Sequence, residues 1–162
     1  MTDFPALLQL LCRQEVEFII IGGLAAVAHG SARATLDLDL VYRRSPDNIS
    51  RLAKALQQHE PYLRGAPPGL PFSWDEETIR RGLNFTLTCT LGHIDLLGEV
   101  VGGGTYEDLE PQADSVELFG FRCLCLGLEA LIRTKRAAGR PKDLEAIAEL
   151  ERILEERQDQ DG

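Results

Sequence analysis

Long apolar runs and an excess of basic residues are both missing from this 162-residue sequence. No run approaches the roughly 20 apolar residues needed to span a bilayer. Residues 1–5 also lack the basic start and apolar segment of a signal peptide, so we expect a cytoplasmic protein without a membrane partner. The formal net charge of -9 is unusual for a protein that coats nucleic acid, although a local basic site is compatible with it.

The sequence also lacks the common metal and nucleotide motifs. Its four cysteines include no Cys-x-x-Cys pair, which fits reduced, mostly buried thiols better than a disulfide framework or a zinc site. No histidine-rich ligand set is present, and we interpret His29 and His93 as structural. No P-loop lysine follows a glycine-rich stretch, and the third glycine of a Rossmann fingerprint is missing.

What is present predicts an α/β (α+β) fold. With 44% hydrophobic residues, we expect residues 1–162 to form one domain with a small mixed β-sheet, flanking helices and a helical C-terminal portion.

The Pro- and Gly-rich residues 61–74 predict a surface loop that Trp74 pins. Residues 157–162 are polar and are expected to fray. Periodicity and turn signals predict helices over 4–14, 24–29, 45–60, 128–138 and 142 to about 156, a helical turn over 75–81, strands over 16–21 and 35–41, and hairpins over 84–97 and 113–126.

Two aspartates alternate with leucines in the strand predicted over residues 35–41. Because a strand places residues i and i+2 on one face, Asp37 and Asp39 point the same way while the leucines point into the core. Like charges held side by side are unfavourable unless a cation lies between them, and oxygen ligands suit Mg²⁺ or Mn²⁺. The simpler alternative is an edge strand whose solvent-facing side carries aspartate for solubility.

A glycine pair, Gly22 and Gly23, follows the apolar residues 19–21 and precedes a helix of small residues. At such a junction main-chain N–H groups are open, and the positive end of the helix dipole favours a phosphate group. Glycine also lets a phosphate approach closely. The alternative is a tight turn that binds no ligand.

A third aspartate, Asp95, lies in the second strand of the hairpin predicted over residues 84–97. It shares a face with His93 and Leu97, and it would join Asp37 and Asp39 if the two strands were neighbours with matching orientation. The sequence leaves this register open.

A basic cluster stands out near the C-terminus of an otherwise acidic chain. Such charges favour the negative end of a helix dipole and are frequently solvent-facing, which is our interpretation of Arg133 and Arg136. Arg33 precedes the aspartate strand and could bind a phosphate or pair with a nearby acid. The cluster comprises Arg133, Lys135, Arg136, Arg140 and Lys142.

Together, Gly22-Gly23, Asp37-Leu38-Asp39 and the isolated Asp95 resemble the nucleotidyltransferase superfamily typified by DNA polymerase beta, in its minimal form. Residues 128–144, with Lys135 and the segment Arg140-Pro141-Lys142-Asp143, resemble the corresponding region of the AbiEii-type toxin branch. The resemblance covers about residues 16–150. It implies a nucleotidyltransferase-like fold.

The resemblance also implies an activity. A nucleoside monophosphate would pass from a nucleoside triphosphate, such as ATP, to an acceptor, with Mg²⁺ or Mn²⁺ as cofactor and pyrophosphate as the second product. Asp37 and Asp39 would bind two divalent ions, and Asp95 would complete the metal site and assist as a base. Lys135 and Asp143 match residues that relatives place near the nucleotide phosphates. Many relatives carry serine where Gly23 stands, so only backbone donors remain at this position.

The acceptor is not encoded in a readable motif, and a protein hydroxyl, an RNA end or a small molecule would each fit. The alternative function is an inactive nucleotidyltransferase-fold module that binds a partner protein, such as the antitoxin of a toxin–antitoxin pair. The presence of all three carboxylates argues for activity. A phosphatase with a nucleophilic aspartate fits less well, because Ala34-Thr35-Leu36 precedes Asp37 and no flexible glycine follows it.

Overall fold

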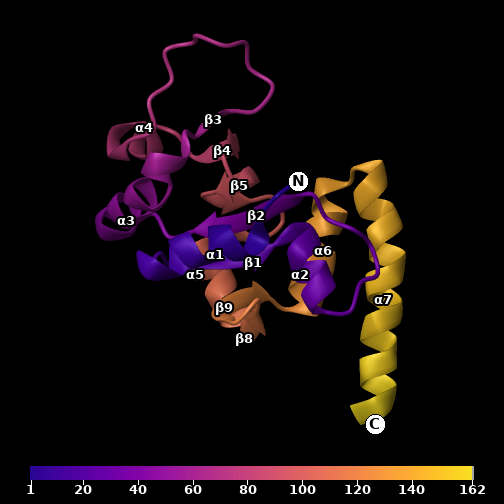
Figure 1. The fold of residues 1–162 in the computed structure, drawn as a ribbon. Helices are drawn as coiled ribbons and strands as arrows, with labels where there is room; N and C mark the ends of the chain where they lie inside the picture. Colours follow the sequence, from indigo (N-terminus) through magenta and orange to yellow (C-terminus); the bar gives the residue numbers. More distant parts are fainter. Residues whose placement is uncertain (162) are drawn as a thin grey trace.

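The computed structural model describes residues 1–161 and shows helices flanking a central mixed sheet (Figure 1). The helices are α1 (Phe4–Arg13), α2 (Gly22–Ala28), α3 (Pro46–Leu56), η1 (Gln57–His59), α4 (Glu76–Arg81), α5 (Tyr106–Leu109), η2 (Glu110–Gln112), α6 (Leu128–Ala138) and α7 (Pro141–Asp161). The strands are β1 (Phe18–Ile21), β2 (Asp37–Tyr42), β3 (Tyr62–Leu63), β4 (Asn84–Cys89), β5 (Gly92–Leu97), β6 (Glu99–Val100), β7 (Gly104–Thr105), β8 (Ala113–Leu118) and β9 (Phe121–Leu126).

The main sheet has seven strands in the order β3-β4-β5-β2-β1-β9-β8. The β1–β9 and β2–β5 pairs are parallel and the remaining pairs are antiparallel. The predicted mixed sheet with flanking helices is therefore confirmed. It is wider than expected, because the β8–β9 hairpin joins β1 through a parallel pairing and extends the sheet on that side.

Short-range signals determine where several helices begin. Ser45 caps α3 by accepting a hydrogen bond from the Asn48 N–H, and Pro46 follows it at the first helical position. Asp75 caps α4 by accepting from the Thr78 N–H at 2.8 Å. Both helix starts were predicted, because a capping side chain and its target N–H lie within one turn.

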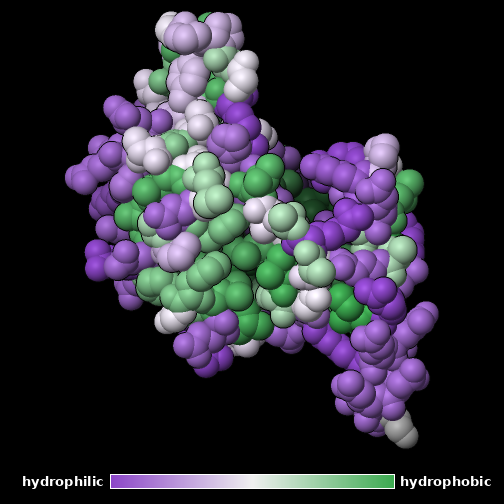
Figure 2. Space-filling view, turned by 45° about the vertical axis from the view of Figure 1, so that its right-hand side comes forward, coloured by the Kyte–Doolittle hydropathy of each residue, from purple (hydrophilic) through white to green (hydrophobic). Residues whose placement is uncertain are grey.

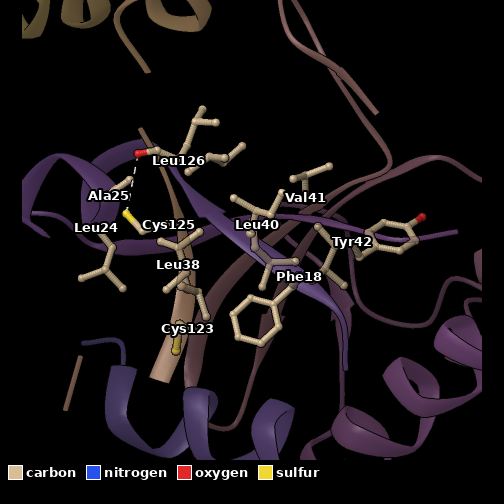
Figure 3. Packing of buried hydrophobic residues seen from close by; sticks show 14 of the residues in the cluster. Phe18, Leu24, Ala25, Leu38, Leu40, Val41, Tyr42, Cys123, Cys125 and Leu126 are labelled. Carbon is tan, nitrogen blue, oxygen red and sulfur yellow. Dashed lines mark hydrogen bonds between the residues drawn. The ribbon is translucent and has the colours of Figure 1, made fainter. Parts of the chain in front are cut away.

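The core lies beneath the central strands. Leu38 and Leu40 are fully buried, as the alternation with aspartate predicted, and Figure 3 shows them among the packed apolar side chains. The same prediction is wrong for Leu36, which is 73% exposed because it lies before β2 begins. Cys123 and Cys125 are buried on one face of β9. All four cysteines are free, in agreement with the predicted thiols.

Residues 61–74 contain one strand that was not predicted. β3 pairs with β4 at the edge of the sheet, and the chain then projects from the body before it reaches α4 (Figure 1). Trp74 closes this loop, since its indole N–H donates to the Ala53 carbonyl at 3.0 Å and its ring packs edge-on against Phe85. Trp74 therefore pins the loop, as predicted.

The C-terminal helix is longer than predicted. α7 continues to Asp161, so the expectation of a frayed end from residue 157 is wrong for residues 157–161, and Gly162 lies outside the described residues. Arg157 donates to the His29 carbonyl at 3.1 Å, which ties the helix to the body. Figure 2 shows a hydrophilic surface over the projecting end of α7. Throughout residues 1–161, no helix combines the length and apolar character needed to cross a bilayer.

Candidate active site

The sheet register brings three aspartates together. β2 and β5 are parallel neighbours, and Asp39 is paired with Asp95. Because Asp37 precedes Asp39 by two residues, all three side chains project from the same face of the sheet. One carboxylate oxygen from each lies within 4.8 Å of the others. We call Asp37, Asp39 and Asp95 the acidic triad.

Repulsion within the acidic triad affects the pKa of Asp39. The pKa of Asp39 is raised to about 8 by burial, by a hydrogen bond with Asp95 and by the negative charges of Asp95 and Asp37, while Lys135 opposes the shift. Without a further cation, Asp39 therefore holds a proton near neutral pH. A divalent ion would favour the ionised carboxylate and release that proton.

The donor set fits a hard divalent cation. All three side chains offer only oxygen ligands, which suit Mg²⁺ and Mn²⁺. One of these oxygens, Asp95 Oδ1, is buried and has no hydrogen-bond partner within residues 1–161. A buried acceptor without a partner is costly, and a bound cation would satisfy it.

The glycine pair allows α2 to begin directly against the acidic triad. Gly22 has φ +68°, and a Cβ atom there would lie 2.2 Å from Asp39 Oδ2. A Cβ on Gly23 would lie 2.4 Å from Thr35 Oγ1. Close packing of the junction against β2 thus requires both glycines, whether or not a phosphate binds there.

A basic cavity of about 330 Å³ adjoins the acidic triad. Lys135 reaches it from α6, and its pKa is lowered by burial, although Asp143 and Asp39 oppose this effect. Arg33 also lines the cavity, and it forms an ion pair with Glu145 at 3.4 Å. The predicted nucleotide-binding residues around this cavity are Gly22, Gly23, Arg33, Lys135 and Asp143.

Asp143 lines the same cavity but is committed to an ion pair. It is buried and accepts from Arg140 Nε at 2.6 Å and from Arg140 Nη2 at 3.2 Å. Burial pushes the pKa of Asp143 upward, but the bonds to Arg140 and the charge of Lys135 outweigh burial, so the net shift is downward. Asp143 therefore holds Arg140 at the cavity wall.

The other basic side chains of α6 point away from the acidic triad. Arg133 donates to the Gly102 carbonyl at 3.3 Å, and Arg136 pairs with Glu151. Neither residue lines the two cavities beside the triad, and both are exposed, as predicted for solvent-facing charges. His29 is buried with Nε2 2.7 Å from the Leu126 carbonyl oxygen, which agrees with a structural role.

A second cavity of about 380 Å³ opens beside Asp95. The residues that it shares with the basic cavity are Gly22, Asp37, Asp39, Lys135, Arg140, Lys142 and Asp143. Its remaining wall combines polar side chains with apolar ones from β5 and the following turn. These additional residues include Asn84, Thr86, Leu97, Val100 and Val101. The acidic triad thus adjoins two cavities that share basic residues, and the second cavity adds apolar side chains.

Two residues at the triad were not predicted as site residues. Arg64 Nη2 lies 2.9 Å from Asp95 Oδ1, and Arg64 Nη1 lies 3.7 Å from Asp37 Oδ2. His93 Nδ1 lies 3.3 Å from Asp37 Oδ1. The alternation in the second hairpin strand places His93 on the face of Asp95 and could have indicated it. No sequence signal marked Arg64, because it lies among Pro and Gly residues beside a two-residue strand.

These features define a nucleotidyltransferase-like fold, and the comparison with solved structures shows the same fold. The chain is similar to the lincosamide antibiotic adenylyltransferase LnuA in its lincomycin-bound form, with 14% identity over 94% of this chain and 98% of that one and a TM-score of 0.62. It is also similar to ANT(2'')-Ia in complex with adenylyl-2''-tobramycin, with 12% identity, coverage of 98% and 97%, and a TM-score of 0.57. A Thermotoga maritima protein described as a candidate nucleotidyltransferase gives 16% identity, coverage of 94% and 91%, and a TM-score of 0.54.

Sequence comparison adds no closer relationship. No protein-family profile matches the chain, and no curated protein sequence matches it significantly. The function must therefore be argued from the fold and from the geometry of the acidic triad and its cavities.

Proposed function

We propose that this protein is a Mg²⁺- or Mn²⁺-dependent nucleotidyltransferase that moves a nucleoside monophosphate from a nucleoside triphosphate to a hydroxyl group of an acceptor. The observation that carries the proposal is that the basic cavity adjoins the acidic triad. Three carboxylates that could hold divalent ions adjoin a cavity lined by Lys135, Arg33 and Arg140. A metal–triphosphate complex carries both charge signs and would match this arrangement.

In this proposal Asp37, Asp39 and Asp95 hold the divalent ions, which when bound would supply charge stabilisation at the phosphates. Lys135 and Arg33 bind phosphate oxygens, and the open main chain at Gly22 and Gly23 lets the phosphates approach. Asp143 contributes indirectly by holding Arg140.

Asp95 also accepts the proton of the attacking hydroxyl, because it borders the second cavity, in which we place the acceptor. The acceptor oxygen forms a bond to the α-phosphorus, the bond from that phosphorus to the bridging oxygen of the β-phosphate breaks, and pyrophosphate leaves. Asp37 and Asp39 would hold a divalent ion, which would neutralise charge on the reacting phosphate.

We further propose that the acceptor is a small molecule. The cavity beside Asp95 measures about 380 Å³, within the usual range of roughly 300–1,000 Å³ for small-molecule sites. Its wall combines the polar Asn84 and Thr86 with the apolar Val100 and Val101, which suits a compact molecule with polar and apolar parts. Lincomycin and adenylyl-tobramycin occupy two of the similar structures. A net charge of -9 also disfavours a long nucleic-acid acceptor.

Calorimetric titration with each of the four ribonucleoside triphosphates and Mg²⁺ tests the proposal. We expect wild-type protein to bind at least one of them, and the double variant Asp37→Asn/Asp39→Asn to bind it more than about tenfold less tightly, because the ligands of the metal are lost. The control Asp47→Asn/Asp159→Asn removes the same charge at exposed positions and should bind like wild type. Folded wild-type protein that binds no triphosphate would contradict the proposal.

The alternative of an inactive partner-binding module gives a different result in the same experiment. Such a module would bind nucleotide without Mg²⁺, if at all, and would tolerate the loss of Asp39. The likeness of residues 128–144 to AbiEii-type toxins stays a proposal from sequence, as does an antitoxin partner. The three similar structures above are not described as toxins.

A further inference from the structure

Arg64 reaches the acidic triad from the edge of the sheet. It follows β3 directly, and its main-chain N–H donates to the Thr86 carbonyl at 3.0 Å. Its guanidinium donates through Nη2 to the Leu87 carbonyl at 2.6 Å. The same group lies 2.9 Å from Asp95 and 3.7 Å from Asp37, so it crosses β4 to reach both carboxylates.

The contact of Arg64 with the triad is an imperfect one. Although Nη2 lies 2.9 Å from Asp95 Oδ1, this oxygen accepts no hydrogen bond from any described residue. Arg64 Nε is likewise buried without a partner in the described part of the chain. The guanidinium therefore neutralises charge and bonds to the Leu87 carbonyl, but Asp95 Oδ1 and Arg64 Nε stay without a hydrogen bond from or to any described residue, which reduces the net gain of the pairing.

Arg64 and a divalent ion would compete for the same carboxylates. The side chain of Arg64 is only 22% exposed, so its charge is poorly screened at this position. A metal ion between Asp37 and Asp95 would meet a fixed positive charge within a few ångströms, and repulsion between the two cations would be large in this partly buried site.

We propose that Arg64 is an internal counter-cation, which stabilises the acidic triad when no metal is bound and which a divalent ion must displace. The inference rests on the proposed function, because it assumes that the triad binds metal. It adds a regulation of the same site, because metal binding is coupled to release of the Arg64 side chain from the two carboxylates.

The chain around Arg64 permits such a movement. Gly65 follows it with φ +80° and open space around its α-carbon. The next residues form the projecting loop in Figure 1, which is held at its far end by Trp74. The loop itself is also held by the Tyr62 hydroxyl, which donates to the Pro67 carbonyl and accepts from the Leu70 N–H. The Arg64 side chain can therefore leave the carboxylates while the loop stays attached through the Tyr62 hydroxyl and the Trp74 indole.

Calorimetric titration with Mn²⁺, without nucleotide, tests the competition. The variant Arg64→Gln should bind Mn²⁺ about tenfold more tightly than wild type, because no fraction of the protein is blocked by the arginine. The matched control is Arg51→Gln. Arg51 pairs with Glu17 at 3.3 Å and also has a buried Nε without a partner among residues 1–161, but it lies away from the triad. This control should bind Mn²⁺ like wild type.

Equal or weaker Mn²⁺ binding by Arg64→Gln would overturn the inference while leaving the proposed metal site intact. If neither wild type nor the variant binds Mn²⁺, the proposed function fails together with the inference. The two failures are therefore distinguishable in one titration series.

Limited trypsin digestion of the wild-type protein gives a test that needs no variant. Trypsin must take the arginine side chain into its own pocket, so it cuts the Arg64–Gly65 bond only when Arg64 has left the carboxylates. We expect Mn²⁺ to accelerate this cut severalfold relative to cuts after Arg80 and Arg81, which lie on α4 and report any effect on the protease itself. Unchanged or slower cleavage at Arg64 with Mn²⁺ would overturn the inference.

Discussion

At the scale of the residue, burial and the repulsion within the acidic triad raise the pKa of Asp39. Its pKa of about 8 means that the folded protein binds a proton that the unfolded chain, with an ordinary value of 3.8, has already released. Between about pH 4 and pH 8 the folded state therefore binds more protons, so the free energy of unfolding falls as the pH rises through this window.

We expect Asp39→Asn to remove this dependence. Between pH 5.5 and 8.5, in the absence of divalent ions, wild type should lose on the order of 2 kcal/mol more stability than the variant, measured by urea unfolding. Added Mn²⁺ should reduce the wild-type slope, because it stabilises the ionised form. The exposed Asp47→Asn serves as the control and should keep the wild-type slope. An identical slope in Asp39→Asn would show that Asp39 is not the group responsible.

At the scale of the element, the junction between β1 and α2 positions the carboxylate strand. Two effects act at Gly22, the left-handed backbone and the close approach of Asp39 Oδ2. Gly120, in the turn between β8 and β9, shares a positive φ of +83°, but a Cβ added there would meet nothing within 4 Å. A comparison of alanine substitutions at Gly22 and Gly120 therefore distinguishes the effect of backbone strain from the effect of the close contact with Asp39.

We predict that Gly22→Ala lowers the free energy of unfolding by about 3 kcal/mol and that Gly120→Ala lowers it by about 1 kcal/mol. Gly22→Ala should also weaken Mn²⁺ binding, because the added methyl group displaces the Asp39 carboxylate. Chemical denaturation and calorimetry measure the two effects. Equal losses of stability in both variants would mean that the junction relaxes and that the contact with Asp39 is unimportant.

At the scale of the whole molecule, the site joins two parts of the chain. The sheet supplies the acidic triad, α6 supplies Lys135, the connection to α7 supplies Arg140, and the first turn of α7 supplies Asp143. Helix α7 also holds the segment before β2, since Glu149 accepts hydrogen bonds from Ser31 and Ala32. Nucleotide binding should therefore depend on the packing of α7 against the body, whereas metal binding should depend mainly on the sheet.

A substitution of Leu150, which is fully buried on α7, tests whether nucleotide binding depends on the packing of α7 while metal binding does not. Leu150→Ala should cost about 2–4 kcal/mol of stability and weaken triphosphate binding severalfold, because the basic wall loses its support. Its affinity for Mn²⁺ should change little. Leu144→Ala on the same helix removes a side chain that is 56% exposed and should leave both affinities unchanged. If Leu150→Ala binds triphosphate as tightly as Leu144→Ala, the basic wall does not depend on α7.

The sequence by itself determined the local features of this protein. Alternation placed Asp37 and Asp39 on one strand face with Leu38 and Leu40 in the core, and turn residues located both hairpins. The capping residue Ser45, followed by Pro46, located the start of α3. These features were predictable because their causes act within a few residues of the chain.

Only the tertiary structure decided how the parts meet. The parallel register that pairs Asp39 with Asp95, the pairing that brings Arg64 over the triad, and the burial that raises the pKa of Asp39 all join residues far apart in sequence. Strand register is determined by packing across the whole sheet, and a one-residue shift would turn Asp95 to the opposite face. No periodicity within a single segment carries that information, so the sequence predicted the three aspartates but not their assembly.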